Sequence, residues 1–502
     1  MPFLQNLNFT QNPFENHTAE TEPEIGLYAV RPPYLEKISE KAKSLSSFIL
    51  FGDRGAGKSA TRLTVFKELW AEAKNLKPFL IYLTDFTELQ EPFRQNKLTD
   101  LDIVKLTAFY SIEQMLVWLS SLPEDQRTQR LSKLTAQDKT LIFALVKGFY
   151  LSKNDLDREL STHEAFEILN SAWVTKSLAW TEKRWESLSK ITSTILSVFT
   201  KKVAGSDDVD ISGPAEQLLK SLIGSSPQTS RAILVKLVEF CQVFEFSGLC
   251  VMVDKLDETT ATMSSSEATA RLIHPLLSNT QLLEIKGLSW ILFLWSSVQH
   301  QFNEKHKIRL DRISHANISW QKDQLREMLA KRVGYFSNGK LGFLDLFAED
   351  IATDATADRI MAISVSSPRE LIKLLEIIIR EHDARNTAGL LNAESVKVGI
   401  DRYCTETIGT WYERATLQQI YRVGKLEFVS KDVQTKFKIS APAASVKLRD
   451  WENSGLIKRD GDSPSESGGK PVYKYAISDP RVAHIIREQL DATVGEDVDD
   501  GE

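Results

Sequence analysis

The chain has 502 residues, of which 42% are hydrophobic and 26% charged; this is the composition of an ordinary folded protein and excludes disordered and fibrous classes. A chain of this length exceeds what one hydrophobic core usually organises, so we expect two to four domains. The formal net charge of -6 and the isoelectric point of about 5.9 exclude a global basic field that would attract nucleic acid or an anionic membrane.

The cysteines and the apolar runs exclude further classes. Cys241, Cys250 and Cys404 are scattered, without C-x-x-C spacing, which argues against a zinc site and a disulfide framework. The stretch from Met1 to Phe14 lacks the basic start and apolar run of a signal peptide. No apolar run approaches the roughly 18 residues that span a bilayer. We therefore expect a cytoplasmic protein with no membrane partner.

The first informative element is an apolar run from Phe48 to Phe51, followed by a glycine-rich turn and an amphipathic stretch from Lys58 to about Ala73. This order predicts a strand, a loop and a helix. The turn matches the pattern G-x-x-x-x-G-K-[ST] in full, in the context that the phosphate-binding P-loop requires. Its residues are Gly52, Asp53, Arg54, Gly55, Ala56, Gly57, Lys58 and Ser59.

Each residue type in this pattern serves phosphate binding. Glycines let backbone N–H groups approach the phosphates, and the positive N-terminus of the following helix assists. We expect Lys58 to reach the β and γ phosphates of ATP, and the hydroxyl of Ser59 to bind Mg²⁺.

A second strand is predicted from Phe79 to Leu83, and helical periodicity follows from about Gln90 to Phe240. Ile112, Met115 and Leu119, for example, fall on one helix face. Another helical stretch is predicted around residues 166–180. We interpret the whole region as a large helical insertion.

The third predicted strand, from Leu249 to Val253, ends in acidic residues. A P-loop needs an acidic element on another strand, which holds the metal and orients the attacking water. Asp254 ends the strand and is the expected magnesium ligand. Asp257 or Glu258 could polarise the water, and we favour Asp257.

A fourth strand is predicted from Trp290 to Trp295. Strands that alternate with helices predict a parallel sheet, and such sheets bind ligands beyond the carboxyl ends of their strands. The loop at Gly52 follows such an end.

The C-terminal part is predicted to be helical from Ser319 to about His382, with a helix start at Ser367 and Pro368. A different small unit follows. It has two predicted helices, Phe428 to Phe437 and Ser440 to Glu452, and then two predicted strands, Leu456 to Arg459 and Val472 to Ile477, around a Ser/Gly-rich loop. This pattern indicates a winged helix.

The small unit carries a local excess of basic side chains, and phosphate contact is one use for them. Asp450, Glu452 and Asp460 dilute the positive field, so duplex DNA and a protein partner stay as alternatives. The basic residues are Lys447, Arg449, Lys458, Arg459, Lys470 and Lys474.

Together, the P-loop, the acidic strand end and the C-terminal unit resemble the bacterial branch of the origin-recognition-like AAA+ and STAND-related P-loop ATPases. The spacing Asp254-x-x-Asp257-Glu258 departs from the adjacent Asp-Glu of most AAA+ ATPases and is similar to that of STAND ATPases. The resemblance covers about residues 25–480, and the large helical insertion is not part of the common core.

The resemblance implies roles for four further residues. Ser296, after the fourth strand, would sense the γ-phosphate. Arg309 and Arg312 stand where such ATPases offer an arginine finger to a neighbouring subunit, and a guanidinium suits phosphoryl charge. Arg369, in the first turn of a helix, would be a second nucleotide sensor. Ordinary helix capping and surface ion pairs are the alternatives at these positions.

The resulting domain prediction follows the chain. It comprises an N-terminal extension (1–35), a P-loop ATPase core (36–320) with the helical insertion (about 90–240), a helical lid (321–405), a winged helix (406–490) and an acidic disordered tail (491–502).

The leading functional hypothesis is an ATP-hydrolysing switch that forms a homo-oligomer on ATP binding and works with a separate effector protein in a bacterial defence or mobile-element system. The alternative is a DNA-binding initiator or loader that grips duplex DNA with its winged helix. Intact Lys58, Ser59 and Asp254 argue against a third class, an inactive nucleotide-binding scaffold.

Overall fold

The computed structural model describes residues 2–16, 28–31, 33–71, 77–154, 158, 188–189, 191–193, 212–224, 226, 228–263, 265–349, 351–385, 389–463 and 471–496. The chain divides into two compact units, one of residues 31–318 and one of residues 1–30 with 319–502. The helical stretch predicted at 166–180, Lys470 and the last six residues of the predicted tail lie outside the described residues.

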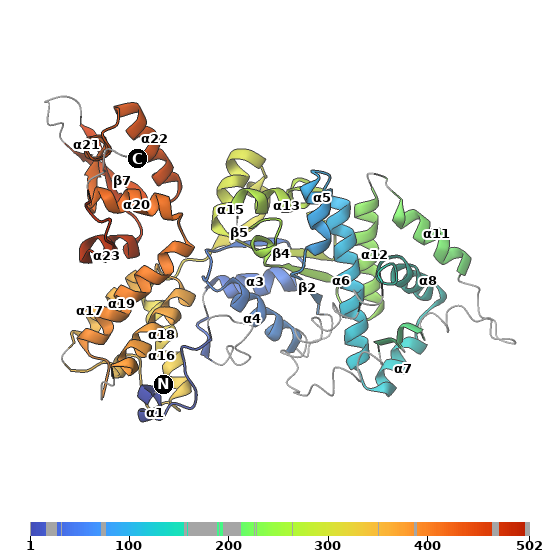
Figure 1. Ribbon diagram of the computed structural model, residues 1–502. Helices are drawn as coiled ribbons and strands as arrows, with labels where there is room; N and C mark the ends of the chain where they lie inside the picture. Colours follow the sequence, from blue (N-terminus) through green and yellow to red (C-terminus); the bar gives the residue numbers. More distant parts are fainter. Residues whose placement is uncertain are drawn as a thin grey trace. The chain divides into compact units, whose positions relative to one another are not determined.

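The unit of residues 31–318 is built on a parallel sheet (Figure 1). The strand order is β2-β3-β4-β1-β5, and every pairing between neighbours is parallel. This confirms the predicted α/β fold. The strands are β1 (Phe48–Phe51), β2 (Phe79–Leu83), β3 (Leu249–Val253), β4 (Leu288–Leu294) and β5 (Ser314–Asn317).

Apolar sequence explains four of these strands. Every residue of β1, β2, β3 and β4 is buried, as expected for strands covered on both faces. The edge strand β5 was not predicted, because its sequence, Ser-His-Ala-Asn, has no apolar run and none of its residues is buried.

Several helices pack on this sheet. α6 packs on β2, α12 packs on β3, and the two helices pack on each other. The helices of the unit are α3 (Pro33–Lys43), α4 (Lys58–Ala71), α5 (Gln90–Arg94), α6 (Asp100–Ser121), α7 (Glu124–Ser132), α8 (Ala136–Leu145), α11 (Ser212–Ile223), α12 (Thr229–Val243), α13 (Ser266–Ser278), α14 (Thr280–Leu283) and α15 (Ser296–Gln301).

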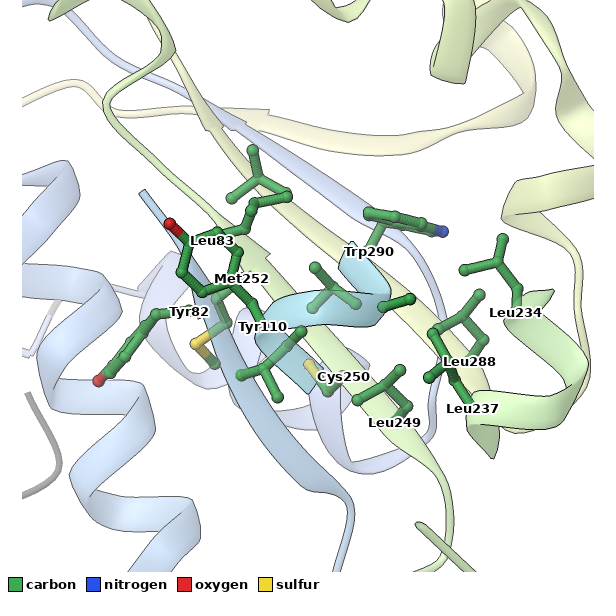
Figure 2. Packing of buried hydrophobic residues seen from close by; sticks show 14 of the residues in the cluster. Tyr82, Leu83, Tyr110, Leu234, Leu237, Leu249, Cys250, Met252, Leu288 and Trp290 are labelled. Atoms are coloured by element: carbon green, nitrogen blue, oxygen red, sulfur yellow. The ribbon is translucent and has the colours of Figure 1, made fainter. Parts of the chain in front are cut away.

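Short turns of helix complete the unit: the 3-10 turns Thr87–Leu89, Leu256–Glu258 and Leu310–Arg312, and the π turns Val146–Tyr150 and Phe302–His306. Figure 2 shows the core around the central strands. Leu249, Leu288 and Trp290 of the sheet lie beside Leu234 and Leu237 of α12.

The predicted helical insertion also covers the outer edge of the sheet. Among the described strands, β2 pairs on one side only, and an open strand edge invites pairing with another chain. Gln114 of α6 occupies this edge. The backbone N–H of Tyr82 donates to Oε1 of Gln114 (3.0 Å), and Nε2 of Gln114 donates to the carbonyl of Tyr82 (2.9 Å). One side-chain amide thus imitates a neighbouring strand.

The second unit begins with helices that share one core with the N-terminal segment. The N–H of Phe3 donates to Asp383 of α18 (2.8 Å), and this bond anchors α1 to that helix. The helices are α1 (Pro2–Asn6), α16 (Lys322–Phe336), α17 (Thr353–Ile363), α18 (Pro368–Ala384), α19 (Ala393–Thr407), α20 (Arg414–Val423), α21 (Ser430–Phe437), α22 (Ala441–Asn453) and α23 (Pro480–Glu488), with 3-10 turns at Leu344–Leu346 and Ile408–Thr410.

The C-terminal part of this unit is a winged helix. Helices α21 and α22 are followed by the strand pair β7 (Ile457–Ser463) and β8 (Val472–Ile477), and the antiparallel order is β6-β8-β7. One prediction here is wrong. Phe428 and Val429 do not begin a helix; they belong to strand β6 (Glu427–Val429), because Phe428 is buried and pairs with Tyr475.

Among the described helices, none is both long enough and apolar enough to cross a membrane.

Candidate functional site

The loop from Gly52 to Ser59 connects β1 to α4 at the carboxyl edge of the sheet. Two of its glycines adopt positive φ angles, 76° at Gly55 and 96° at Gly57, which side chains disfavour. Gly52 lies so close to Ile318 that a Cβ atom there would come within 2.8 Å of that side chain. The pattern glycines are therefore needed for the shape of the loop itself.

Lys58 folds back over this loop. Its Nζ donates to the carbonyl oxygens of Gly52 (2.8 Å) and Asp53 (3.1 Å). Burial lowers the pKa of Lys58, and the nearby carboxylates, Asp257 first and then Asp254, oppose this shift. The ammonium group is thus held at the loop by weak backbone acceptors, which phosphate oxygens can replace.

The Ser59 hydroxyl meets the end of β3. It donates to Oδ2 of Asp254, and the two oxygens lie 3.0 Å apart. Adjacent ligands of an octahedral Mg²⁺, each about 2.0–2.1 Å from the ion, are separated by about 3 Å. Ser59 and Asp254 therefore fit two neighbouring positions of a magnesium shell.

The described part of the chain holds no cluster of three or more histidine, cysteine, aspartate or glutamate side chains that could bind a metal by itself. Magnesium commonly takes one or two protein ligands and completes its shell with phosphate oxygens and water. The pair of Ser59 and Asp254 suits that mode of binding.

Arg62 is a member of the site that the sequence analysis missed. Its side chain is only 2% exposed, and its Nε lies 3.4 Å from Oδ2 of Asp254. Its guanidinium also lies over the ring of Tyr82, 4.8 Å from the centroid. Arg62 follows Ser59 by three residues on α4, so that helical spacing was the signal that could have found it.

The two acidic residues after Asp254 face different surroundings. Asp257 is buried at 5% exposure, whereas Glu258 is exposed. Between them and Asp254, Lys255 adopts a left-handed conformation (φ 64°, ψ 20°), and its N–H donates to Oδ1 of Asp254 (2.9 Å). After this turn, Asp257 is buried and lies next to Arg54 of the P-loop, whereas Glu258 stays exposed.

Arg54 of the loop makes the contact with Asp257. Its Nε lies 3.4 Å from Oδ2 of Asp257, and its guanidinium lies 4.9 Å from the ring centroid of Trp295, at the end of β4. The P-loop, the buried carboxylate and the end of β4 therefore converge on one side chain.

Ser296 directly follows Trp295 and begins α15. Because β4 pairs with β1 in parallel, Ser296 and the P-loop lie at the same edge of the sheet. Among the described residues, no hydrogen bond joins the Ser296 side chain to the P-loop.

The two arginines that are candidates for an arginine finger differ in their surroundings. Arg309 is bound by Asp311 through two hydrogen bonds, Nε to Oδ1 (3.0 Å) and Nη2 to Oδ2 (2.8 Å). Arg312 is exposed and lines a cavity of about 360 Å³ together with Lys41 and Lys286. Arg312 precedes β5, at the amino edge of the sheet and opposite its own P-loop, so it could act only on the site of another subunit.

Arg369 belongs to the second unit, in the first turn of α18, and is half-buried. The neighbouring Glu370 is buried and accepts a hydrogen bond from the hydroxyl of Tyr403 (2.7 Å). Glu370 also pairs with Lys373 (3.2 Å). Glu370 is thus engaged by both Tyr403 and Lys373.

Most of the basic side chains in the winged helix have acidic or polar partners. Lys474 pairs with Glu427 (2.6 Å), Arg459 pairs with Glu452 (3.3 Å), and Lys447 donates to Gln419 (2.9 Å). Arg449 on α22 and Lys458 on β7 are exposed. Acidic or polar partners thus engage three of the five predicted basic residues that the structure describes.

The site at the carboxyl edge therefore joins a glycine-rich loop, a lysine, a hydroxyl and a carboxylate spaced as two magnesium ligands would be, and a second, buried carboxylate. This combination suits phosphoryl transfer from a nucleotide, in which positioning and charge stabilisation provide most of the catalysis.

Comparisons with known proteins were made on sequence and on structure. No protein-family model matches the chain, and no curated protein matches it. Among solved structures, the chain is similar to ORC1 of Aeropyrum pernix in complex with DNA (12% identity, TM-score 0.37, covering 94% of this chain and 96% of that one). It is also similar to ORC2 of the same organism in ADPNP–ADP complexes (11%, TM-score 0.41, covering 94% and 98%).

A third similar structure is Cdc6p of Pyrobaculum aerophilum (11% identity, TM-score 0.33, covering 92% of this chain and 97% of that one). These are distant similarities to proteins of the origin-recognition type, and they do not show membership of a family or assign a function. They include no support for the bacterial or STAND part of the resemblance.

Proposed function

We propose that this protein binds ATP with Mg²⁺ at the loop from Gly52 to Ser59 and hydrolyses it. The observation that carries this proposal is the 3.0 Å separation of the Ser59 and Asp254 oxygens, which matches adjacent ligands of Mg²⁺. The buried carboxylate of Asp257 beside the same loop supplies the group that hydrolysis additionally needs.

In the proposed reaction, backbone N–H groups of the loop hold the phosphates, and Lys58 donates to the β and γ oxygens. Magnesium held by Ser59 and Asp254 would neutralise part of the phosphate charge. Asp257 accepts a hydrogen bond from water and orients it toward the γ-phosphorus. Water oxygen bonds to phosphorus as the bond to the β-phosphate oxygen breaks, which releases ADP and phosphate.

Calorimetric titration of the full chain with ATP tests the binding step. With Mg²⁺ we expect a single site of higher affinity than in EDTA, because the ion links ATP to Ser59 and Asp254. Equal affinity under both conditions would contradict the metal site, and absence of binding would contradict the nucleotide site.

We further propose that ATP-bound chains assemble and that Arg312, rather than Arg309, acts on the site of a neighbour. Asp311 already binds Arg309 through both carboxylate oxygens, whereas Arg312 belongs to a cationic cavity at the edge of the sheet opposite the P-loop. Ser296 and Arg369 keep their expected sensor roles in this proposal.

If Arg312 acts in this way, specific ATPase activity rises with protein concentration, and Arg312→Ala lowers it by roughly 10³-fold or more, the typical value of an arginine finger. ATP affinity should hardly change. Arg309→Ala serves as the matched control and should retain activity. Concentration-independent activity, together with an active Arg312→Ala variant, would mean that the working unit is a monomer.

For the biological role of the ATPase, we propose the alternative function, in which the winged helix binds duplex DNA. Its support is the helix pair α21 and α22 with an exposed arginine, Arg449, on the second helix and an exposed Lys458 on the wing strand. The comparisons give no support to a defence or mobile-element role, and a separate effector stays a prediction from the sequence alone.

Charge reversal tests this DNA contact. Arg449→Glu should weaken binding to duplex DNA and lower the slope of log affinity against log salt by about 0.9, the value for one lost phosphate contact. Arg487→Glu on α23 makes the same charge change at another exposed position and should leave the slope unaltered. Equal slopes for wild type and Arg449→Glu would remove α22 from the interface.

A further inference from the structure

Arg54 is the one side chain of the P-loop pattern, besides Lys58 and Ser59, that reaches the acidic residues opposite. In the general P-loop pattern, the backbone at this position binds phosphate and the side chain can be of any type. Here the guanidinium lies between the buried carboxylate of Asp257 and the indole of Trp295. Its position is therefore fixed by two elements that are distant in sequence.

The position of Asp257 indicates how close Arg54 lies to the attacking water and the γ-phosphate. A carboxylate that orients the attacking water lies about 2.6–3.2 Å from that water, and the water faces the γ-phosphorus. The Nε of Arg54 is 3.4 Å from this same carboxylate and comes from the loop that cradles the phosphates. If Asp257 orients that water, the guanidinium borders the space in which the γ-phosphate would bind.

The contacts of Arg54 leave it able to bind a further anion. Its contact with Asp257 runs through Nε, and in the described part of the chain its terminal Nη groups make no hydrogen bond. The surface pair of Arg309 and Asp311, by contrast, is closed by two bonds of 3.0 and 2.8 Å. The Arg54 side chain is also 34% exposed, so an incoming phosphate can reach it.

We propose that Arg54 is a catalytic residue that donates to the γ-phosphate of ATP in its own subunit and stabilises the charge that develops there during hydrolysis. This proposal rests on the proposed ATPase function. When ATP is absent, Asp257 balances the charge of Arg54; when ATP is bound, the guanidinium bridges Asp257 and a γ-phosphate oxygen.

The guanidinium keeps all its protons throughout the reaction, because arginine stays charged in proteins. The electron pair of the breaking bond leaves with ADP, and the proton of the attacking water passes to Asp257 or to the departing phosphate. Trp295 holds the guanidinium through a cation–π contact, which limits where it can move.

Substitution of Arg54 separates catalysis from binding. For Arg54→Ala we expect a kcat roughly 10²-fold lower or more, with ATP affinity close to that of wild type, since a charge that acts mainly in the transition state affects turnover. Arg54→Gln, which retains the stem beside Trp295, should behave in the same way. Thermal unfolding checks that both variants are folded.

A second measurement uses ADP with aluminium fluoride, which imitates the transferring phosphoryl group. Such analogues bind roughly 10²-fold tighter or more when the transition-state contacts are intact. Wild type should gain affinity for ADP on addition of fluoroaluminate, and Arg54→Ala should lose that gain while binding ADP normally.

Arg130 offers a matched control. It also pairs with a carboxylate, Glu245 (2.7 Å), and lies 5.4 Å from the ring centroid of Trp118. Arg130→Ala should therefore change neither kcat nor the fluoroaluminate effect. A wild-type kcat in Arg54→Ala would overturn this proposal and leave the ATPase function standing, whereas a wild-type protein without ATPase activity would contradict the proposed function itself.

Discussion

Lys58→Ala is expected to raise the dissociation constant for ATP by roughly 30-fold or more. Removing one partner of a buried, hydrogen-bonded charge pair costs about 2–5 kcal/mol, and each 1.4 kcal/mol is a factor of ten. Lys58 is the cation that bends over the loop, and among the described residues it donates to the carbonyls of Gly52 and Asp53. Calorimetric titration with Mg²⁺ and ATP measures the effect.

The pH dependence of binding offers a second readout for Lys58. In the protein without ATP, burial lowers the pKa of Lys58. Bound phosphates would favour the charged form of this side chain. ATP binding therefore takes up a proton in alkaline solution, and affinity should fall as the pH rises through the lowered pKa. The dependence should vanish in Lys58→Ala.

Lys305→Ala is the matched control for this substitution, since Lys305 is exposed and pairs with Glu267 (2.8 Å) away from the loop. It should bind ATP like wild type. An unchanged affinity in Lys58→Ala would rule out the loop as the phosphate site.

Asp257→Asn is expected to retain ATP binding and to lose turnover by roughly 10²–10⁴-fold, the usual contribution of a positioned acid–base group. Asparagine preserves the size of the buried side chain but cannot accept a proton from water. Single-turnover hydrolysis measures the chemical step, and titration with ATP measures binding separately.

Glu258→Gln provides the internal comparison, because Glu258 is the adjacent acid and is exposed. Its turnover should stay close to wild type. Loss of turnover in Glu258→Gln with a normal Asp257→Asn would reverse the assignment, and near-normal rates in both would remove an acidic water-orienting group from the mechanism.

Much of the fold could be predicted because it is encoded locally. β1, β2 and β3 are continuous apolar runs bounded by polar residues, so their ends matched the prediction residue for residue. β4 starts two residues earlier than predicted. β5 could not be found, because its four residues depend on pairing with β1 and not on an apolar pattern.

The candidate site likewise has parts that are encoded locally and parts that depend on the folded sheet. The pattern from Gly52 to Ser59 is local, so sequence alone identified it. The different exposure of Asp257 and Glu258 arises after a left-handed residue, Lys255, and that conformation has no sequence signature in a non-glycine residue. The contacts of Arg62 with Asp254 and of Arg54 with Trp295 join distant segments, and only the folded sheet brings them together.

The function that we propose for this site is metal-assisted hydrolysis of ATP. Continuous measurement of phosphate release from ATP by the purified full chain, with Mg²⁺ and again in EDTA, tests it most directly. We predict release that requires Mg²⁺ and that saturates with ATP, with Lys58→Ala prepared in parallel giving none. No release from wild type, or equal release from wild type and Lys58→Ala, would contradict the account.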